Sequence, residues 1–401
     1  MTAFVLGGVQ SDFARHISRE GHDLADLVGE LVDGALAEAR IEASDVGVIH
    51  VGNAFGELFA QQGHLGAMPA TARPALWGVP AVRHEAACAS GSVAILGAMA
   101  EIAAGHYDVA LVLGVEQERN VPGELAAQFL GAAAWFGHEA HSARFVWPAM
   151  FARIADVYAE RHGLDRAHTD AIAAKNFANA RDNALAQTRT WSVDPASDDP
   201  KLNPIIAGRL RRSDCAQVTD GGAAIVVASP RFAESWANTR GESLARVPRV
   251  LGWGHRTVGL PLEAKLERSA AGGLMFPHVA EVAADARRRA ARPVQTIAAY
   301  EVHDCFTITE YLAIEHLGLG DPKRAIESGQ TQRTGATPIN PSGGLIGGGH
   351  PVGATGVRMV VDAARQVAGT AGAAQIAGAN TVQTLNLGGS TATVVSFVVG
   401  T

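Results

Sequence analysis

The feature of this sequence that most constrains its fold is an internal repeat. β-Type runs at 3–9, 46–51, 107–115 and 223–228 have counterparts in the same order at 247–253, 296–302, 374–377 and 391–399. The first two runs are 43 positions apart in one half and 49 in the other. In each half a turn of small residues, 88–91 or 350–353, then opens a helical pattern. Strand and helix patterns repeated once predict a duplicated α/β protein.

The two halves differ in length at one place. Cys88 lies 133 positions before Gly221, which opens the last strand of the first half. In the second half only 38 positions separate His350 from Gly388. The excess of roughly 95 residues predicts a cap over the strand ends, where open α/β sheets bind ligands. We predict a first half at 1–115 plus 213–240, an inserted loop domain at 116–212 and a second half at 241–401.

Composition excludes several classes of protein. Hydrophobic residues make up 47% of the chain, which is enough for a folded core. With 33 basic and 40 acidic residues the net charge is −7, which argues against nucleic-acid binding. The longest apolar run, 86–100, is shorter than the roughly 18 residues of a membrane span, and the N-terminus shows no signal peptide, so we expect a cytoplasmic protein without a membrane span.

Three widely spaced cysteines form neither a disulfide framework nor a metal motif, so a functional cysteine would act as a thiol. Cys88 directly precedes a helical pattern at 93–104, and a helix N-terminus lowers the pKa of a thiol. The alternative is a buried structural cysteine, which the sequence supports equally well. Cys215 has no comparable context, and we interpret it as a core residue.

His350 lies in a glycine-dense loop at the position that Cys88 occupies in the first half. The alternative for such a loop is a tight turn with an incidental histidine, but the repeat favours a Cys–His pair in which the imidazole takes the thiol proton. His303 and Cys305 follow the strand at 296–302, at the edge where such sheets bind ligands. Two thiols and two histidines together predict covalent acyl transfer with a proton transfer.

Three motifs together resemble the thiolase superfamily over essentially the whole chain: Glu85-Ala-Ala-Cys88-Ala-Ser-Gly, His303-Asp-Cys-Phe306 and Gly349-His-Pro-Val-Gly-Ala-Thr-Gly356. The resemblance implies a duplicated five-layered αβαβα fold with an inserted loop domain. Ordinary members carry Asn-Glu-Ala-Phe at the second motif and Cys-x-Gly where this chain has Asn386-Leu-Gly388. The His-Asp-Cys-Phe variant is similar to the sterol-carrier-protein-2 type of thiolase, here without a sterol-carrier domain.

The resemblance also implies roles. Cys88 would carry the acyl group as a thioester, His350 would activate it, and Cys305 would exchange the α-proton of the acetyl unit. The His303 and His350 side chains would bind the enolate oxygen, and the backbone N–H groups of Cys88 and Gly388 would form a second oxyanion hole. The implied enzyme is an acetyl-CoA C-acyltransferase with CoA and acyl-CoA as substrates, no tightly bound cofactor and no metal.

Substrate and partners are less constrained. Trp147, Met150 and Phe306 are candidates for an acyl pocket, although core packing explains the first two equally well. Arg209, Arg211 and Arg212 are candidates for the CoA phosphates. The resemblance implies a homodimer or tetramer.

The stretch from Gly52-Asn-Ala-Phe to Gln62-Gly-His-Leu-Gly is similar to thiolases that work beside a zinc-ribbon/OB-fold partner protein. Two alternatives therefore stay open. One is a partner-dependent carbon–carbon lyase or acyltransferase for a bulky, steroid- or polyketide-like substrate, and the other is a noncatalytic subunit with this fold.

Overall fold

The computed structural model describes residues 2–269 and 273–401. Its strands are β1 Ala3–Gln10, β2 Val48–Gly52, β3 Ala81–His84, β4 Val109–Glu116, β5 Ile205–Ala207, β6 Leu210–Arg211, β7 Gly221–Ala228, β8 Arg249–Thr257, β9 Ala299–Val302, β10 Thr381–Gly388 and β11 Thr393–Gly400. Its α-helices are α1 Leu24–Ala39, α2 Gly56–Phe59, α3 Met68–Ala72, α4 Ser90–Ala103, α5 Gly123–Gly131, α6 Val146–His162, α7 Arg166–Arg181, α8 Pro230–Thr239, α9 Leu262–Arg268, α10 Pro277–Ala290, α11 Thr307–His316, α12 Pro322–Glu327, α13 Gly344–Gly348 and α14 Thr355–Ala368.

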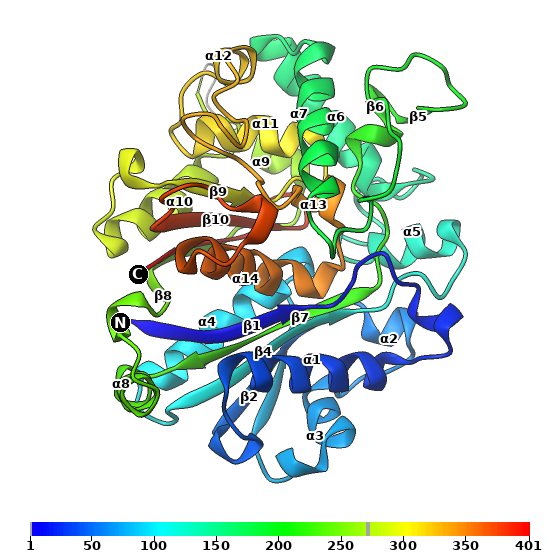
Figure 1. Cartoon of the computed structure of the whole chain (residues 1–401). Coiled ribbons are helices and arrows are strands. Elements are labelled where there is room, and N and C mark those ends of the chain that lie inside the picture. Colours follow the sequence, from blue (N-terminus) through cyan, green and yellow to red (C-terminus); the bar gives the residue numbers. More distant parts are fainter. Residues whose placement is uncertain (1, 270–272) are drawn as a thin grey trace.

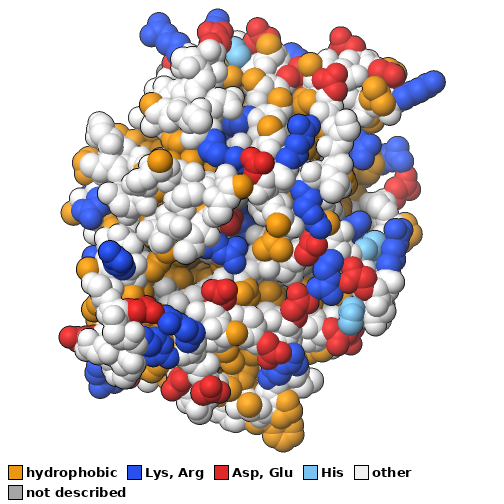
Figure 2. All heavy atoms as spheres, in the orientation of Figure 1, with side chains coloured by type: hydrophobic (Ala, Val, Ile, Leu, Met, Phe, Trp, Pro, Cys, Tyr) orange, Lys and Arg blue, Asp and Glu red, His pale blue; other side chains and the backbone are white. Residues whose placement is uncertain are grey.

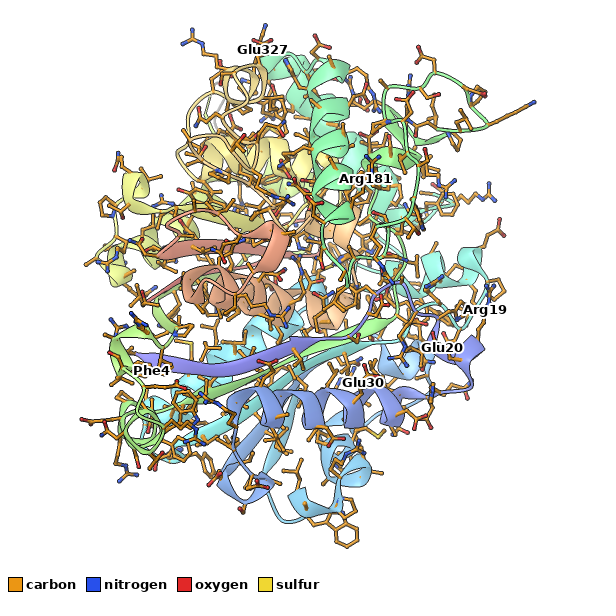
Figure 3. All side chains as sticks on the ribbon, viewed as in Figure 1. Phe4, Arg19, Glu20, Glu30, Arg181 and Glu327 are labelled. Carbon is orange, nitrogen blue, oxygen red and sulfur yellow. The ribbon has the colours of Figure 1, made fainter. Side chains whose placement is uncertain are left out.

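The sheet topology confirms the duplication. Nine strands are hydrogen-bonded in the order β3-β2-β4-β7-β1-β8-β11-β10-β9. From β1 outward the order β7-β4-β2 matches the order β11-β10-β9 from β8 outward, and both series pair antiparallel, antiparallel and then parallel. The two half-sheets are joined through the pairs Ala3↔Val250 and Phe4↔Arg249, at the end of β1 where Figure 3 labels Phe4. β3 adds a parallel strand beyond β2.

Helices and half-sheets form five layers. α4 and α14 lie between the two half-sheets, as Figure 1 shows, and a buried cluster joins both helices to strands of both halves. α1 and α8 cover the outer face of the first half-sheet, and α10 and α11 cover that of the second. The starts of the central helices touch: a Cβ on Gly91 would lie 2.7 Å from the carbonyl oxygen of Gly353. Only glycine permits this close approach.

One strand expectation is wrong, and four strands, β3, β5, β6 and β10, have no counterpart among the predicted runs. Residues 374–377 are not a strand, because a single 3₁₀ turn at Gly372–Ala374 precedes β10. β10 carries Gln383, which is fully buried and donates to the Ala283 carbonyl and to Ser396 Oγ. Buried polar side chains of this kind conceal a strand from a hydrophobic pattern. β3 was missed for the opposite reason, since it is a short strand with two exposed residues.

The predicted inserted segment, 116–212, contains α5, α6, α7 and the small β5–β6 pair. α6 packs into the same buried cluster as α10 and α11. In Figure 1, α5 and the β5–β6 pair lie on the side of the molecule away from both termini. On the face shown in Figure 2, acidic and basic side chains are interspersed. No helix within the described residues has both the length and the apolar character needed to cross a membrane.

Candidate active site

Cys88 lies on a tight turn between β3 and α4. The turn is a 3₁₀ helix at Ala87–Ala89, and Ala87 has a φ of +50°, a left-handed value that is uncommon for a residue with a side chain. Ser90 Oγ donates to the Ala87 carbonyl at 2.6 Å and accepts the Ala86 N–H at 2.9 Å. The turn therefore holds the thiol at the start of the central helix.

The expectation of a low thiol pKa at Cys88 is wrong. Burial raises the pKa of the Cys88 thiol to about 12, and the nearby Glu118 carboxyl adds to the increase. A hydrogen bond from the Gly389 N–H acts in the opposite direction but is the smaller effect. Loss of water around the sulfur outweighs the favourable field of the helix start. The thiol is therefore neutral in the free protein.

His350 is buried beside this turn. Its backbone N–H donates to Thr219 Oγ1, and its Nδ1 lies 2.7 Å from Thr355 Oγ1. Because the Thr355 hydroxyl donates to the Pro351 carbonyl at 3.0 Å, it accepts a proton from His350 Nδ1. Burial lowers the pKa of His350 to about 3, so the ring is neutral and its Nε2 is an available base.

Two buried carboxyls at the end of β4 hold the loop of His350. Glu116 Oε2 accepts the Gly353 N–H at 3.1 Å, and Glu118 Oε1 accepts the Val352 N–H at 3.0 Å. Glu116 also accepts three N–H groups from Asn53 to Phe55. Burial raises the pKa of Glu116 to about 7, and burial together with the neighbouring Glu116 raises that of Glu118 further above its ordinary value. Neither residue is among the predicted site residues, although acids that end an apolar strand are a visible signal.

His303 and Cys305 follow β9 and enter the site from the second half. The His303 ring lies 5.1 Å from that of His350, nearly perpendicular to it, and burial holds the pKa of His303 well below its usual value. Burial also raises the pKa of Cys305, and the nearby Cys88 thiol adds to this effect. Asp304 instead accepts the backbone N–H groups of Leu345 and Ile346 in α13. The motif thus brings the His303 ring and the Cys305 thiol to the site, while its Asp304 carboxylate holds the start of α13.

The structure brings the predicted residues of both halves together. One ligand atom each of Cys88, His303 and His350 lie within 4.8 Å of one another, and Cys305 lines a cavity together with Cys88 and His350. Within the described ranges, this is the group of side chains whose spacing could hold a metal ion, and a thiolate with two imidazoles would suit a soft divalent cation. A thiol beside two imidazoles can equally perform acyl transfer without a metal.

The cavity beside the two thiols has a volume of about 200 Å³ and an apolar lining. Trp147 and Phe306, two of the candidates for an acyl pocket, line it, and Phe151 stacks on Phe306 at 4.5 Å between ring centroids. Met150 is 4% exposed, packs in the core and is not among the lining residues. Other apolar lining residues are Phe55, Leu130, Phe145 and Val146.

Cys215 packs against the core, as we interpreted it, but it also borders the site. Cys215 is only partly buried and lines the cavity together with Cys88 and Cys305. The Ala216 N–H donates to the Cys305 carbonyl at 2.9 Å, which brings this segment beside the loop that follows β9. The contact joins residues 89 positions apart, so no local pattern indicated it.

Gly388 lines a second, more polar hollow of about 890 Å³. Gly389 lines both this hollow and the apolar cavity, so the two spaces meet at the end of β10. Of the three arginines predicted for CoA, Arg209 and Arg211 are ion-paired with Asp156 and Asp198. Arg212 lies over the Trp191 ring.

Comparisons with known proteins identify the family and the fold of this chain. Family models for the thiolase N-terminal domain and the thiolase C-terminal domain-like region match residues 4–195 and 264–401. An acetyl-CoA acetyltransferase of Methanothermobacter thermautotrophicus is 30% identical over 377 residues, 91% of each chain. Human sterol carrier protein 2 is 28% identical over 413 residues, which cover 98% of this chain and 71% of that protein.

Two solved structures share the fold. The Ltp2-ChsH2(DUF35) aldolase superposes with a TM-score of 0.78 at 21% identity, covering 100% of this chain and 97% of that one. The Acat5 thiolase from Ascaris suum, solved in complex with coenzyme A, superposes with a TM-score of 0.68 at 16% identity over the whole of both chains. With both family models and a relative aligned along nearly its full length, this chain belongs to the thiolase family.

Proposed function

We propose that this protein is an acetyl-CoA C-acyltransferase, which cleaves a 3-oxoacyl-CoA with CoA into a shortened acyl-CoA and acetyl-CoA, or runs the reverse condensation. The observation that carries the proposal is the meeting of Cys88, His303 and His350 within 4.8 Å, with Cys305 in the apolar cavity that Cys88 and His350 also line. Concentrations of substrates set the direction of such a reaction.

In the first half-reaction, Cys88 Sγ attacks the 3-keto carbon while its proton passes to Nε2 of His350. The bond between carbons 2 and 3 then breaks, and its electron pair forms the enolate of acetyl-CoA. Cys305 donates its proton to carbon 2, and acetyl-CoA leaves. The products are an acyl thioester on Cys88 and a thiolate on Cys305.

In the second half-reaction, the Cys305 thiolate takes the thiol proton of an incoming CoA. The CoA sulfur attacks the acyl carbon, and Cys88 leaves and recovers its proton from His350. His303 Nε2 and the protonated His350 are proposed as donors to the enolate oxygen. The backbone N–H groups of Cys88 and Gly388 are proposed as donors to the acyl oxygen. One such donor is worth about 3 kcal/mol of barrier.

The cavity supports an acyl group that is largely apolar. Aromatic and aliphatic side chains surround both thiols, and each buried methylene contributes about 0.8 kcal/mol to binding. We propose that this cavity holds the acyl chain and that CoA reaches Cys88 from outside it. The joint retention of Cys88 and Cys305 supports thiolysis over a retro-aldol lyase, because cleavage by a lyase requires no acyl-accepting thiol.

We also propose a homodimer, and the exposed edge of the sheet supports it. β3 is the edge strand beyond β2, and Val82 on it is 44% exposed. Unpaired edge strands of this kind are ready to pair with a second chain. One experiment tests both the proposed reaction and the need for a further partner protein.

The experiment is the intact mass of the protein after brief incubation with acetyl-CoA or acetoacetyl-CoA, beside a Cys88→Ala control. We expect one acetyl group on the native chain and none on the control. If neither gains mass, longer acyl-CoAs with and without a candidate DUF35 partner follow. Continued absence of an acyl group would exclude the proposed reaction.

A further inference from the structure

Asn386 contacts the site from β10, at the place where ordinary thiolases carry the cysteine of Cys-x-Gly. The side chain is 1% exposed. Its Nδ2 lies 3.1 Å from the Cys88 carbonyl oxygen and 3.1 Å from Nδ1 of His303. Its Oδ1 lies 2.8 Å from Ser92 Oγ. One amide therefore joins the nucleophile's backbone, the helix behind it and the ring of His303.

These contacts fix which way the amide faces. A backbone carbonyl can only accept a hydrogen bond, so the atom beside the Cys88 carbonyl must be the amide nitrogen. The Ser92 hydroxyl then donates to Oδ1. The amide has little room to move, since a Cβ on Gly356 would lie 2.8 Å from Oδ1.

The orientation of the amide determines the tautomer of His303. The second N–H of Nδ2 points at Nδ1, so Nδ1 must supply a lone pair and the proton of the neutral ring must be on Nε2. His303 Nε2 is buried and has no hydrogen-bond partner among the described residues. One ring nitrogen of His303 lies within 4.8 Å of the Cys88 sulfur and of a ring nitrogen of His350, and because Nδ1 is bonded to Asn386, Nε2 is the nitrogen left to face the site.

We propose that Asn386 is a positioning residue that fixes His303 as a hydrogen-bond donor, with Nε2–H directed at the oxygen of the reacting thioester. The inference rests on the proposed function and adds a residue to its machinery. Asn386 does not touch the substrate; it acts through His303.

The neighbouring histidine, His350, carries its proton on the other ring nitrogen. Thr355 accepts from Nδ1 of His350 and leaves Nε2 as a base, whereas Asn386 donates to Nδ1 of His303 and leaves Nε2 as a donor. The two imidazole rings, 5.1 Å apart, thus carry their protons on different nitrogens because their hydrogen-bond partners differ. The same assignment opposes a metal ion in the site, because His303 would have to give up its Nε2 proton and its bond to Asn386.

The test has two parts. First, the ¹⁵N chemical shifts of His303, assigned against a His303→Gln protein, are measured in the native chain and in Asn386→Leu. We expect a protonated Nε2 and an unprotonated Nδ1 in the native chain, and a mixture of tautomers in the variant. A native His303 protonated on Nδ1 would overturn the proposal, and this readout requires no catalytic activity.

Second, the variant is assayed for thiolysis and for exchange of acetyl-CoA α-protons with solvent deuterium. For Asn386→Leu we expect kcat and the exchange rate to fall about 10- to 100-fold with KM essentially unchanged, while Cys88 still gains an acetyl group. Ser92→Ala, which only loosens the amide, should give a smaller loss in the same direction. The control is Asn203→Leu, which removes another buried asparagine, one bonded to Pro195 and Ser213 outside the site.

Each outcome counts for or against the proposal. Native rates and native His303 shifts in Asn386→Leu would overturn it. Equal losses in Asn386→Leu and Asn203→Leu would assign the effect to stability alone and also overturn it. If the native chain fails to become acetylated, the proposed function fails, but the His303 shifts still report whether Asn386 sets the tautomer.

Discussion

The ends of β4 and β10 occupy equivalent positions in the two halves, and each contacts the helix start of the opposite half. At the end of β4, Glu116 accepts the N–H of Gly353 in the His350 loop. At the end of β10, Asn386 donates to the carbonyl of Cys88. Each half thus contacts the helix start of the other, as expected where two copies of one unit pack about a pseudo-twofold axis.

The two strand ends differ in chemistry. The β4 end offers carboxyls, which accept backbone N–H groups and so fix where the base lies. The β10 end offers an amide, which also donates and so fixes which atom of a ring carries the proton. Duplication supplied one framework twice, and different polar side chains at matching positions hold the turn of Cys88 at one helix start and the loop of His350 at the other.

The largest expected effect comes from removing the two residues that the helix starts carry. Cys88→Ala and His350→Ala should each lower kcat for thiolysis by about 10⁴-fold or more, and the double variant should be no worse than either. Non-additivity follows because the thiol and its base act as one unit. Cys215→Ala, which changes a third residue of the same cavity, should leave kcat essentially unchanged. Additive losses would show that the two helix starts act independently.

The second prediction concerns whether the Cys88 thiol passes its proton to His350 before substrate binds. Burial raises the pKa of Cys88 to about 12 and lowers that of His350 to about 3, so both should be neutral near pH 7. The thiolate fraction then grows tenfold per pH unit, and alkylation of Cys88 by iodoacetamide should be about 100-fold faster at pH 9 than at pH 7.

Peptide mass mapping after timed labelling measures this rate. The control is the same peptide in the urea-unfolded chain, where the rate should level off above the ordinary thiol pKa of 9.0. A plateau below pH 8 in the folded protein would mean that His350 already holds the thiol proton in the free enzyme.

The third prediction concerns the β4 end alone. Burial and the neighbouring Glu116 hold the pKa of folded Glu118 well above its model-peptide value of 4.5. The folded protein therefore keeps a proton that the unfolded chain releases. Stability from this group is complete below pH 4.5 and is lost as the pH rises toward the folded pKa, by about 1.4 kcal/mol per pH unit.

Glu118→Gln should reduce that pH dependence, because glutamine imitates the neutral acid and still accepts the Val352 N–H. Urea unfolding between pH 5 and pH 8 measures the free energy of unfolding. Glu281→Gln is the control, since Glu281 is an exposed carboxylate paired with Arg256. An unchanged pH slope in Glu118→Gln would mean that Glu118 is ionised in the folded protein.

The sequence can predict the contacts that are local in the chain or that the internal repeat relates to one another. The pairing of Cys88 with His350 was predictable, because the repeat equates their positions. The pKa of Cys88 was not, since the helix start is visible in the sequence but the depth of burial is not. Glu116, Glu118 and Asn386 act on the opposite half, and the segment of Cys215 meets that of Cys305 through a hydrogen bond between residues 89 positions apart, so their roles depend on strand order rather than on local pattern.

The smallest expected effect comes from a change in the apolar cavity beside the two helix starts. Trp147 lines it and donates its Nε1–H to the Leu130 carbonyl at 2.8 Å. Trp147→Phe shortens the side chain and enlarges the cavity, so kcat/KM should rise for acyl chains one or two carbons longer, by about fourfold per added methylene at 0.8 kcal/mol each. Acetylation of Cys88 should not change, because neither helix start is altered. Trp135→Phe makes the same change at a side chain that is 44% exposed and outside the cavity, and it should leave the chain-length profile as it is. Identical profiles for both variants would place the acyl chain elsewhere, and the more polar hollow beside Gly388 would then be the place to test.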